Sequence, residues 1–237
     1  MRASLALIAL SVACSISHSA GRERPGLGTA WGETRSSRVH EVSFERSSGL
    51  PFAQATFFYD DSEGVEAMAG RSSHGGGIPA RAGLEASVVD ERGQPLATVR
   101  AADRIYVVGE EGLRYRLRVH NRTSRRVEVV ASVDGLDVMD GRSASFDKRG
   151  YLVEPHETLM IDGFRRSQSE VAAFRFGSVS GSYAARTGDD RNVGVIGFAF
   201  FDELGSRDYD EEQSDETGRR RDAKPFSDSR YAQPPGM

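Results

Sequence analysis

Cysteine is almost absent from this sequence of 237 residues, in which Cys14 is the only one. It lies in a segment with the features of a secretory signal peptide: Arg2 carries a positive charge, Leu5 to Val12 are apolar except for Ser11, and residues 14–20 are mostly small or polar. We therefore expect a signal peptide over 1–20. Its removal would leave an exported chain without disulfides, thiolate metal sites or a cysteine nucleophile.

The position of cleavage leaves two outcomes open. A cut after Ser19 or after Ala20 gives nearly the same soluble product. A cut before Cys14 would follow an imperfect lipoprotein box, residues 10–13, and would attach a lipid that anchors the chain. No later apolar run approaches spanning length, so we expect no transmembrane segment in the mature chain. The expected location is the periplasm, the cell surface or the extracellular medium.

Lysine is also scarce, since Lys148 and Lys224 are the only two, and the arginine-, alanine- and glycine-rich composition is typical of a GC-rich bacterium. Residues 84–201 contain 17 Lys plus Arg against 17 Asp plus Glu, which cancel. A neutral stretch of this length argues against a nucleic-acid partner. Residues 202–237 contain 6 basic against 10 acidic residues and few apolar ones, which predicts a disordered acidic tail.

The sequence has no apolar stripe with the spacing of a helix. Apolar and polar side chains instead alternate one by one, as they do in strands. From Arg114 to His120 basic and apolar side chains alternate strictly, and Val127 to Val133 repeat the period after Asn121 to Ser124. This pattern predicts two half-buried strands joined by a tight hairpin turn. The strands expected in this half of the chain are Leu84–Val89, Ala97–Arg100, Ile105–Val108, Leu113–His120, Val127–Val133, Gly150–Val153, Thr158–Ile161, Val171–Phe176 and Asn192–Phe200.

Many short strands without helices predict a mainly β fold, an antiparallel β-sandwich of immunoglobulin-like or jelly-roll-like type. The strand over Asn192–Phe200 is apolar on both faces and is expected to lie centrally. The expected organisation is a signal peptide (1–20), an N-terminal extension (21–60) with strands at Val39–Arg46 and Ala53–Tyr59, a flexible linker (61–83), the sandwich (84–201) and the acidic tail (202–237). Whether the extension stands apart, docks on the sandwich or supplies edge strands to it is left open.

The second half of the sequence contains five blocks that stand out: Ser132–Gly141 (SVDGLDVMDG), Lys148–Tyr151 (KRGY), Ala172–Val179 (AAFRFGSV), Ser182–Gly188 (SYAARTG) and Arg191–Gly197 (RNVGVIG). Together they resemble a group of uncharacterised exported bacterial proteins. The likeness covers about Leu113 to Phe201. It implies export and a bacterial source, but the group has no known activity, so it transfers no functional residue.

Five arginines form the first candidate site. Arg114, Arg116 and Arg118 share one face of a predicted strand, and Arg125 and Arg126 follow the predicted hairpin turn. Guanidinium groups bind carboxylates, sulfates and phosphates with two parallel hydrogen bonds, so the row suits an anionic polymer. The alternative is an ordinary solvent-facing sheet surface, with the arginines paired to carboxylates such as Glu128.

A weaker candidate is a calcium site at Asp134, Asp137 and Asp140, because oxygen-rich loops bind calcium in extracellular modules. Their spacing does not follow an EF-hand, and aspartates beside glycines also cap turns. Turn capping is the favoured interpretation, and we expect no metal.

Signatures of catalysis are sparse. His40, His74, His120 and His156 lack metal-ligand spacing, and Ser73 beside His74 lacks the strand–turn–helix context of a nucleophile elbow. We therefore expect no catalytic residue, no cofactor, and a binding or structural module that contacts an envelope polymer or protein. Two alternatives stay open: a carbohydrate-directed hydrolase, which needs two converging carboxylates, and an assembly or adhesion factor that pairs through a sheet edge.

Overall fold

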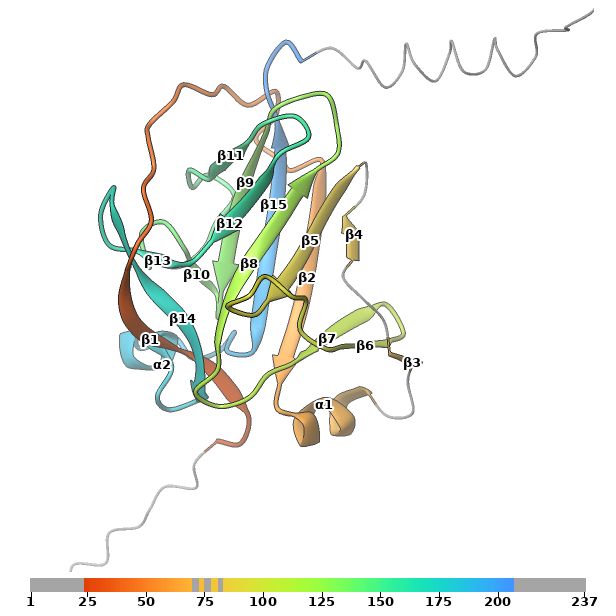
Figure 1. Ribbon diagram of the computed structural model, residues 1–237, viewed down its shortest axis with the longest axis vertical. Coiled ribbons are helices and arrows are strands. Elements are labelled where there is room, and N and C mark those ends of the chain that lie inside the picture. The colour runs from red at the N-terminus through yellow and green to blue at the C-terminus, as the bar shows by residue number, and fades with distance from the viewer. Residues whose placement is uncertain (1–23, 70–72, 75–77, 81–82, 207–237) are drawn as a thin grey trace, which may run out of the picture.

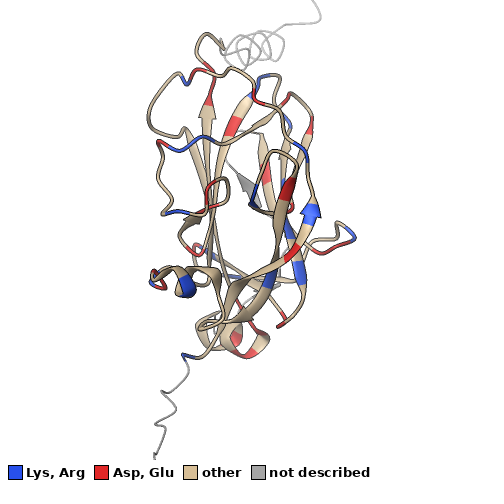
Figure 2. Ribbon diagram, turned by 90° about the vertical axis from the view of Figure 1, so that its left-hand side faces the viewer, with Lys and Arg blue, Asp and Glu red and all other residues tan. Residues whose placement is uncertain are grey.

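The alternating segments of the sequence form two β-sheets packed face to face in the computed structural model (Figures 1 and 2). The structure describes residues 24–69, 73–74, 78–80 and 83–206. The expected signal peptide and the tail beyond residue 206 lie outside the described residues.

The first sheet has the strand order β1-β14-β8-β5-β4, with β12 also paired to β8 and β13 to β14. All of its pairs are antiparallel. Its strands are β1 (Leu27–Ser36), β4 (Ile78–Ala80), β5 (Leu84–Val89), β8 (Arg114–Asn121), β12 (Thr158–Ile161), β13 (Gly163–Arg165) and β14 (Glu170–Ser178).

The second sheet has the order β10-β9-β15-β2-β7-β6-β3, with β11 also paired to β9. Its strands are β2 (Ala53–Asp60), β3 (Ser73–His74), β6 (Thr98–Ala101), β7 (Arg104–Val108), β9 (Val127–Val133), β10 (Leu136–Asp137), β11 (Tyr151–Val153) and β15 (Val195–Asp202). The β2–β7 pair is parallel and the other pairs are antiparallel. The predicted mainly β sandwich is confirmed.

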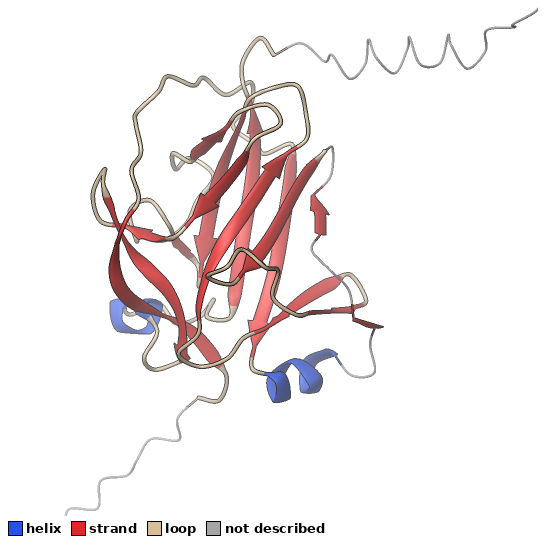
Figure 3. Cartoon of the chain, viewed as in Figure 1, coloured by secondary structure: helices blue, strands red, loops and turns tan. Residues whose placement is uncertain are grey.

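Two short helices lie at the same end of the sandwich, α1 (Ser62–Ala69) beside β2 and β7, and α2 (Tyr183–Thr187) beside β1 (Figure 3). Ser182 caps the start of α2 by accepting a hydrogen bond from the Ala185 amide, and Gly188 ends it with φ of 92°. Neither described helix has the length and apolar character that crossing a membrane requires.

A continuous hydrophobic core lies between the sheets. Tyr115 of β8 stacks on Phe174 and Phe176 of β14 with ring centroids 5.3 Å and 4.3 Å apart, and all three side chains are buried. From the other sheet, Ile196 and Phe198 of β15 point into the same core. Each such side chain contributes about 1.5–3 kcal/mol by leaving water, so the described part of the sandwich has a substantial core without any disulfide.

The predicted hairpin between β8 and β9 is wrong, because the two strands belong to different sheets. Buried Asn121 fixes this crossing: its Nδ2 donates to the carbonyl oxygens of Arg125, Val153 and Glu154 at 2.7, 3.1 and 3.2 Å. Its Oδ1 accepts from the amide of Thr123 at 2.9 Å. Alternation predicted both strands correctly but carries no information about which neighbour each one joins.

The sandwich is larger than the expected range 84–201, because N-terminal strands, whose relation to it the residue pattern left open, belong to both sheets. β1 pairs along β14, and β2 lies between β15 and β7 inside the second sheet. Part of the expected linker is α1, and β4 pairs with β5. The strand expected over Val39–Arg46 is absent, since Val42 is 61% exposed and only an isolated bridge joins Arg46 to Glu203. The predicted central position of β15 is observed.

Candidate functional site

The arginines of β8 lie on the outer face of the first sheet. The side chains of β8 that point into the core are Tyr115, Leu117 and Val119. The alternate side chains therefore point away from the core, and these are Arg114, Arg116 and Arg118. Acidic and basic residues are interspersed along the strands of the sandwich (Figure 2). The row is therefore not an isolated basic surface.

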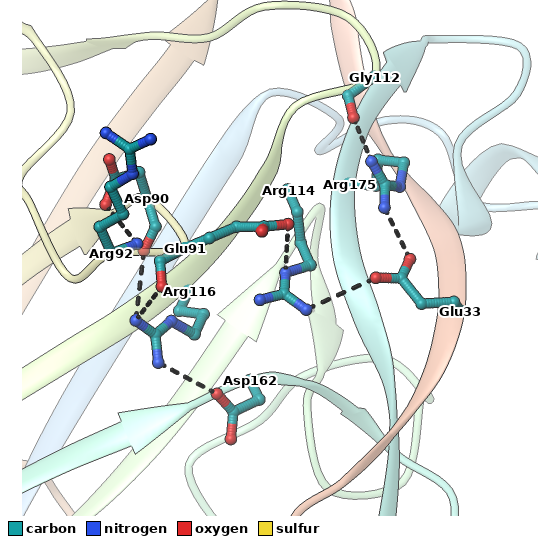
Figure 4. Close-up of polar contacts among 9 residues, drawn as sticks. All are labelled: Glu33, Asp90, Glu91, Arg92, Gly112, Arg114, Arg116, Asp162 and Arg175. Carbon is teal, nitrogen blue, oxygen red and sulfur yellow. Dashed lines mark hydrogen bonds and ion pairs between the residues drawn. The ribbon is translucent and has the colours of Figure 1, made fainter.

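Arg114 is enclosed between two glutamates (Figure 4). Its Nε lies 2.9 Å from Glu91 Oε1, its Nη1 lies 3.5 Å from Glu33 Oε1, and only 8% of Arg114 is exposed. Glu33 also accepts a hydrogen bond from Arg175 at 2.8 Å. That bond, with the nearby positive charges, lowers the pKa of Glu33. Arg114 thus has its charge balanced within the protein.

The next two arginines of the row bind the turn that follows β5. Arg116 Nη2 donates to the carbonyl oxygen of Glu91 at 3.0 Å, and its Nη1 lies 3.8 Å from Asp162 Oδ1 (Figure 4). Arg118 donates to Ser87 Oγ at 3.0 Å and to the Gly93 carbonyl at 3.3 Å. The row is a set of internal contacts that fasten this turn to the sheet.

Arg125 and Arg126 belong to a separate cluster on the second sheet. Arg125 lies 3.0 Å from Asp202, and Arg126 binds Glu203 through two nitrogen atoms. The hydrogen bond to Glu203 raises the pKa of Arg126. The five predicted arginines therefore do not form one surface, and each has an acidic or polar partner.

The three aspartates of the calcium candidate have separate roles. Asp134 and Gly135 form the turn between β9 and β10 with φ of 55° and 80°, as Asp-Gly pairs do in tight hairpins. Asp137 Oδ1 accepts from the Met139 amide at 2.8 Å, whereas Asp140 pairs with Lys148. Among the described residues, no three acidic, histidine or cysteine side chains are placed to hold a metal ion.

A polar network that the sequence did not indicate lies inside the core. The Thr29 hydroxyl bonds to the hydroxyls of Tyr59 and Tyr115 at 2.8 Å and 2.6 Å. Tyr59 donates to Asp134 Oδ1, and the amides of Thr29 and Gly194 donate to the same carboxylate at 2.8 Å and 3.0 Å. Burial raises the pKa of both tyrosines and of Asp134. Because Thr29 and Tyr115 belong to the first sheet, the network joins the two layers.

The outer face of the second sheet is hollowed along β15, and we name this hollow the outer trough. Its volume is about 330 Å³. The strand register places two rows across its floor, Val130–Ala199–Gln54 and Ser132–Gly197–Thr56. The other lining residues are Ala55, Gly135, Ala144, Ser145, Phe146, Asn192, Val195 and Phe198.

Two of the floor residues, Gly197 and Ala199, have little or no side chain. Gly197 has none, and a Cβ placed there would lie 2.8 Å from Ser132 Oγ. Ala199, two residues further along β15, is almost fully buried and packs with Val130 and Phe201. Phe146 is also among the lining residues. Phe146 contacts Phe201 edge-on with centroids 6.4 Å apart, and 42% of it is exposed.

Four neutral polar side chains of the outer trough are unengaged, whereas a fifth, Ser145, donates a hydrogen bond to Asp147. Gln54 and Thr56 come from β2, Ser132 from β9, and Asn192 from the loop before β15. Their side chains bond to no group in the part of the chain that the structure describes. No charged residue is among the described lining residues. Donors and acceptors are thus available here to an uncharged ligand.

Comparison with known proteins gives no relative from which a function could be transferred: no family model, no curated protein and no solved structure matches this chain.

Proposed function

We propose that this chain is an exported binding module of the bacterial envelope, which holds its ligand in the outer trough and performs no chemistry on it. The observation that carries the proposal is the gathering of four unengaged neutral side chains, Gln54, Thr56, Ser132 and Asn192, from separate segments into one hollow. Ligand sites typically combine such a few convergent polar groups with an apolar lining.

Binding is favoured over hydrolysis by the same lining. Glycoside hydrolysis ordinarily uses two carboxyl groups on either side of the scissile bond. The described residues of the outer trough include neither aspartate nor glutamate. The buried carboxylate of Asp134 already accepts hydrogen bonds from Tyr59, Thr29 and Gly194, which supports a structural role for it.

The outer trough is also favoured over the arginine row. An anion that approached Arg114 would have to displace Glu33 and Glu91, which already balance its charge. Displacement would exchange one ion pair for another and would gain little. A ligand that binds Gln54, Thr56, Ser132 and Asn192 breaks no hydrogen bond or ion pair of these side chains within the described residues.

Cosedimentation of the purified protein with isolated bacterial envelopes tests the proposal. Thr56→Trp fills the outer trough from an exposed position, and Ser36→Trp adds the same side chain at an exposed position of β1 as the matched control. We expect the first variant to lower the affinity at least about tenfold and the second to leave it unchanged. Equal behaviour of the two variants contradicts the proposed site, and release of soluble product from the envelopes contradicts the non-enzymatic role.

A further inference from the structure

We infer that the ligand of the outer trough is an uncharged glycan whose chain runs along β15. This inference rests on the proposed function and names the ligand class of the same site. Four features of the described residues support it: the shape of the floor, the side-chain chemistry, the engaged backbone and the exposed aromatic ring.

The floor suits flat, ring-shaped units laid end to end. From Val195 to Ala199 the trough follows four residue steps of β15, a length of about 13 Å. Gly197 and Ala199 keep this path free of protruding side chains. The open side permits a chain to extend beyond the lined length.

The polar groups match hydroxyls. The amides of Gln54 and Asn192 and the hydroxyls of Thr56 and Ser132 each supply both a donor and an acceptor. A sugar hydroxyl also donates and accepts, so it can pair with either kind of group. A charged polymer would instead lose solvation without meeting an opposite charge among the described lining residues.

An extended peptide fits less well, because the backbone of the floor is already engaged. β15 pairs with β2 from Val195 to Phe200 and with β9 from Ile196 to Asp202, and the Val195 carbonyl accepts a hydrogen bond from the Asp134 amide. Peptides that bind to sheets gain affinity from main-chain hydrogen bonds at a free edge. The outer trough lies on a sheet face and offers side chains instead.

Phe146 provides an apolar surface for a sugar ring. It is held against Phe201, and Arg46 donates a hydrogen bond to its carbonyl oxygen, so the loop that carries it is fixed to the sheet. The C–H-rich face of a pyranose ring packs well against an aromatic side chain. Nearly half of the Phe146 surface remains available for such a contact.

Isothermal titration of the purified protein tests the ligand class. The probes are cellohexaose, chitohexaose, maltohexaose and neutral polysaccharide purified from envelopes, with hexagalacturonate as the anionic counterpart and an uncharged Ser/Gly peptide as the polypeptide counterpart. We expect at least one neutral glycan to bind and the anion and the peptide not to bind. Thr56→Trp is expected to abolish the binding.

Variants of Phe146 separate stacking from a general effect on the loop. Phe146→Leu is expected to weaken binding of the neutral glycan about tenfold, whereas Phe146→Trp is expected to retain it. Met68→Ala removes an equally exposed apolar side chain from α1 and is the control. Equal affinities of the Leu and Trp variants contradict the stacking role.

The outcomes distinguish the inference from the proposed function. One outcome is that hexagalacturonate or the peptide binds while the neutral glycans do not. If Thr56→Trp then abolishes the observed binding, the inferred ligand class is wrong but the proposed site is correct. Self-association that Thr56→Trp prevents would show that a second copy occupies the trough, and it too overturns the glycan. Envelope binding that Thr56→Trp leaves unchanged overturns both.

Discussion

The hydroxyl of Tyr59 donates a hydrogen bond to Asp134 Oδ1 at 2.5 Å, joining a central strand of the second sheet to the turn that ends β9. Thr29, on the edge strand of the first sheet, bonds to both residues. A satisfied buried network of this kind favours one arrangement of the two sheets, because any shift would leave polar groups unpaired in the core.

Asp134→Asn is expected to destabilise the fold by about 1–3 kcal/mol. The carboxylate accepts three hydrogen bonds from Tyr59, Thr29 and Gly194, and an amide would turn a donor toward one of these donors. Urea unfolding measures the change. Asp140→Asn, at a more exposed aspartate paired with Lys148, is the control and is expected to cost at most about 1 kcal/mol. Equal losses in the two variants would contradict the importance of the network.

The stability difference between the wild type and Asp134→Asn is expected to depend on pH. Burial raises the pKa of Asp134 in the folded state, although its hydrogen bonds oppose the rise. The folded protein therefore binds a proton more readily than the unfolded chain between the usual carboxyl pKa of about 3.9 and the raised value. The difference should be largest in acid and should shrink as pH rises through that window. Unfolding curves across this range check the sign, and a difference that grows with pH would show that the pKa is lowered instead.

Arg114→Gln is expected to lower stability by about 1–2 kcal/mol without changing the affinity for envelopes. It removes the ion pairs to Glu33 and Glu91 from a side chain that is almost buried. Arg35→Gln is the control, since Arg35 is exposed on β1 and forms no ion pair with the described residues. A large loss of envelope binding in a folded Arg114→Gln protein would restore the anion-binding interpretation.

Gly163→Ala is expected to destabilise the sandwich by about 2–3 kcal/mol. A Cβ at Gly163 would lie 1.9 Å from the backbone oxygen of Ala172 on the neighbouring strand, so β13 and β14 would have to separate. Gly49→Ala is the matched control, because a Cβ there meets nothing within 4 Å. Thermal unfolding compares them, and equal melting temperatures would contradict the close pairing of the two strands.

The sequence predicted those strands in which apolar side chains alternate, because burial on one face leaves that signature. β8, β9 and β15 were found in this way, and the Asp134–Gly135 turn followed from its residue types. β1 was missed because Gly28 and Gly32 interrupt the pattern. Both are small because Ser182 and the Ala173 backbone approach them closely.

The candidate site could not be predicted, because its parts are distant in sequence. Thr56, Ser132 and Gly197 form one row only after β2, β9 and β15 pair in register. Similarly, the alternation of side chains predicted that the arginines of β8 share one face. It could not predict their ion pairs with Glu33 and Asp162, which belong to another strand and to a loop. Pairing between sheets and between loops is a property of the whole fold.

The dependence of envelope binding on salt tests the central claim most directly. Binding through uncharged groups in the outer trough predicts nearly the same affinity in about 0.05 M and about 0.5 M NaCl, because salt screens only interactions between charges. Binding through the arginines would weaken severalfold or more over the same range. A constant affinity supports the outer trough, and a steep fall with salt would contradict it.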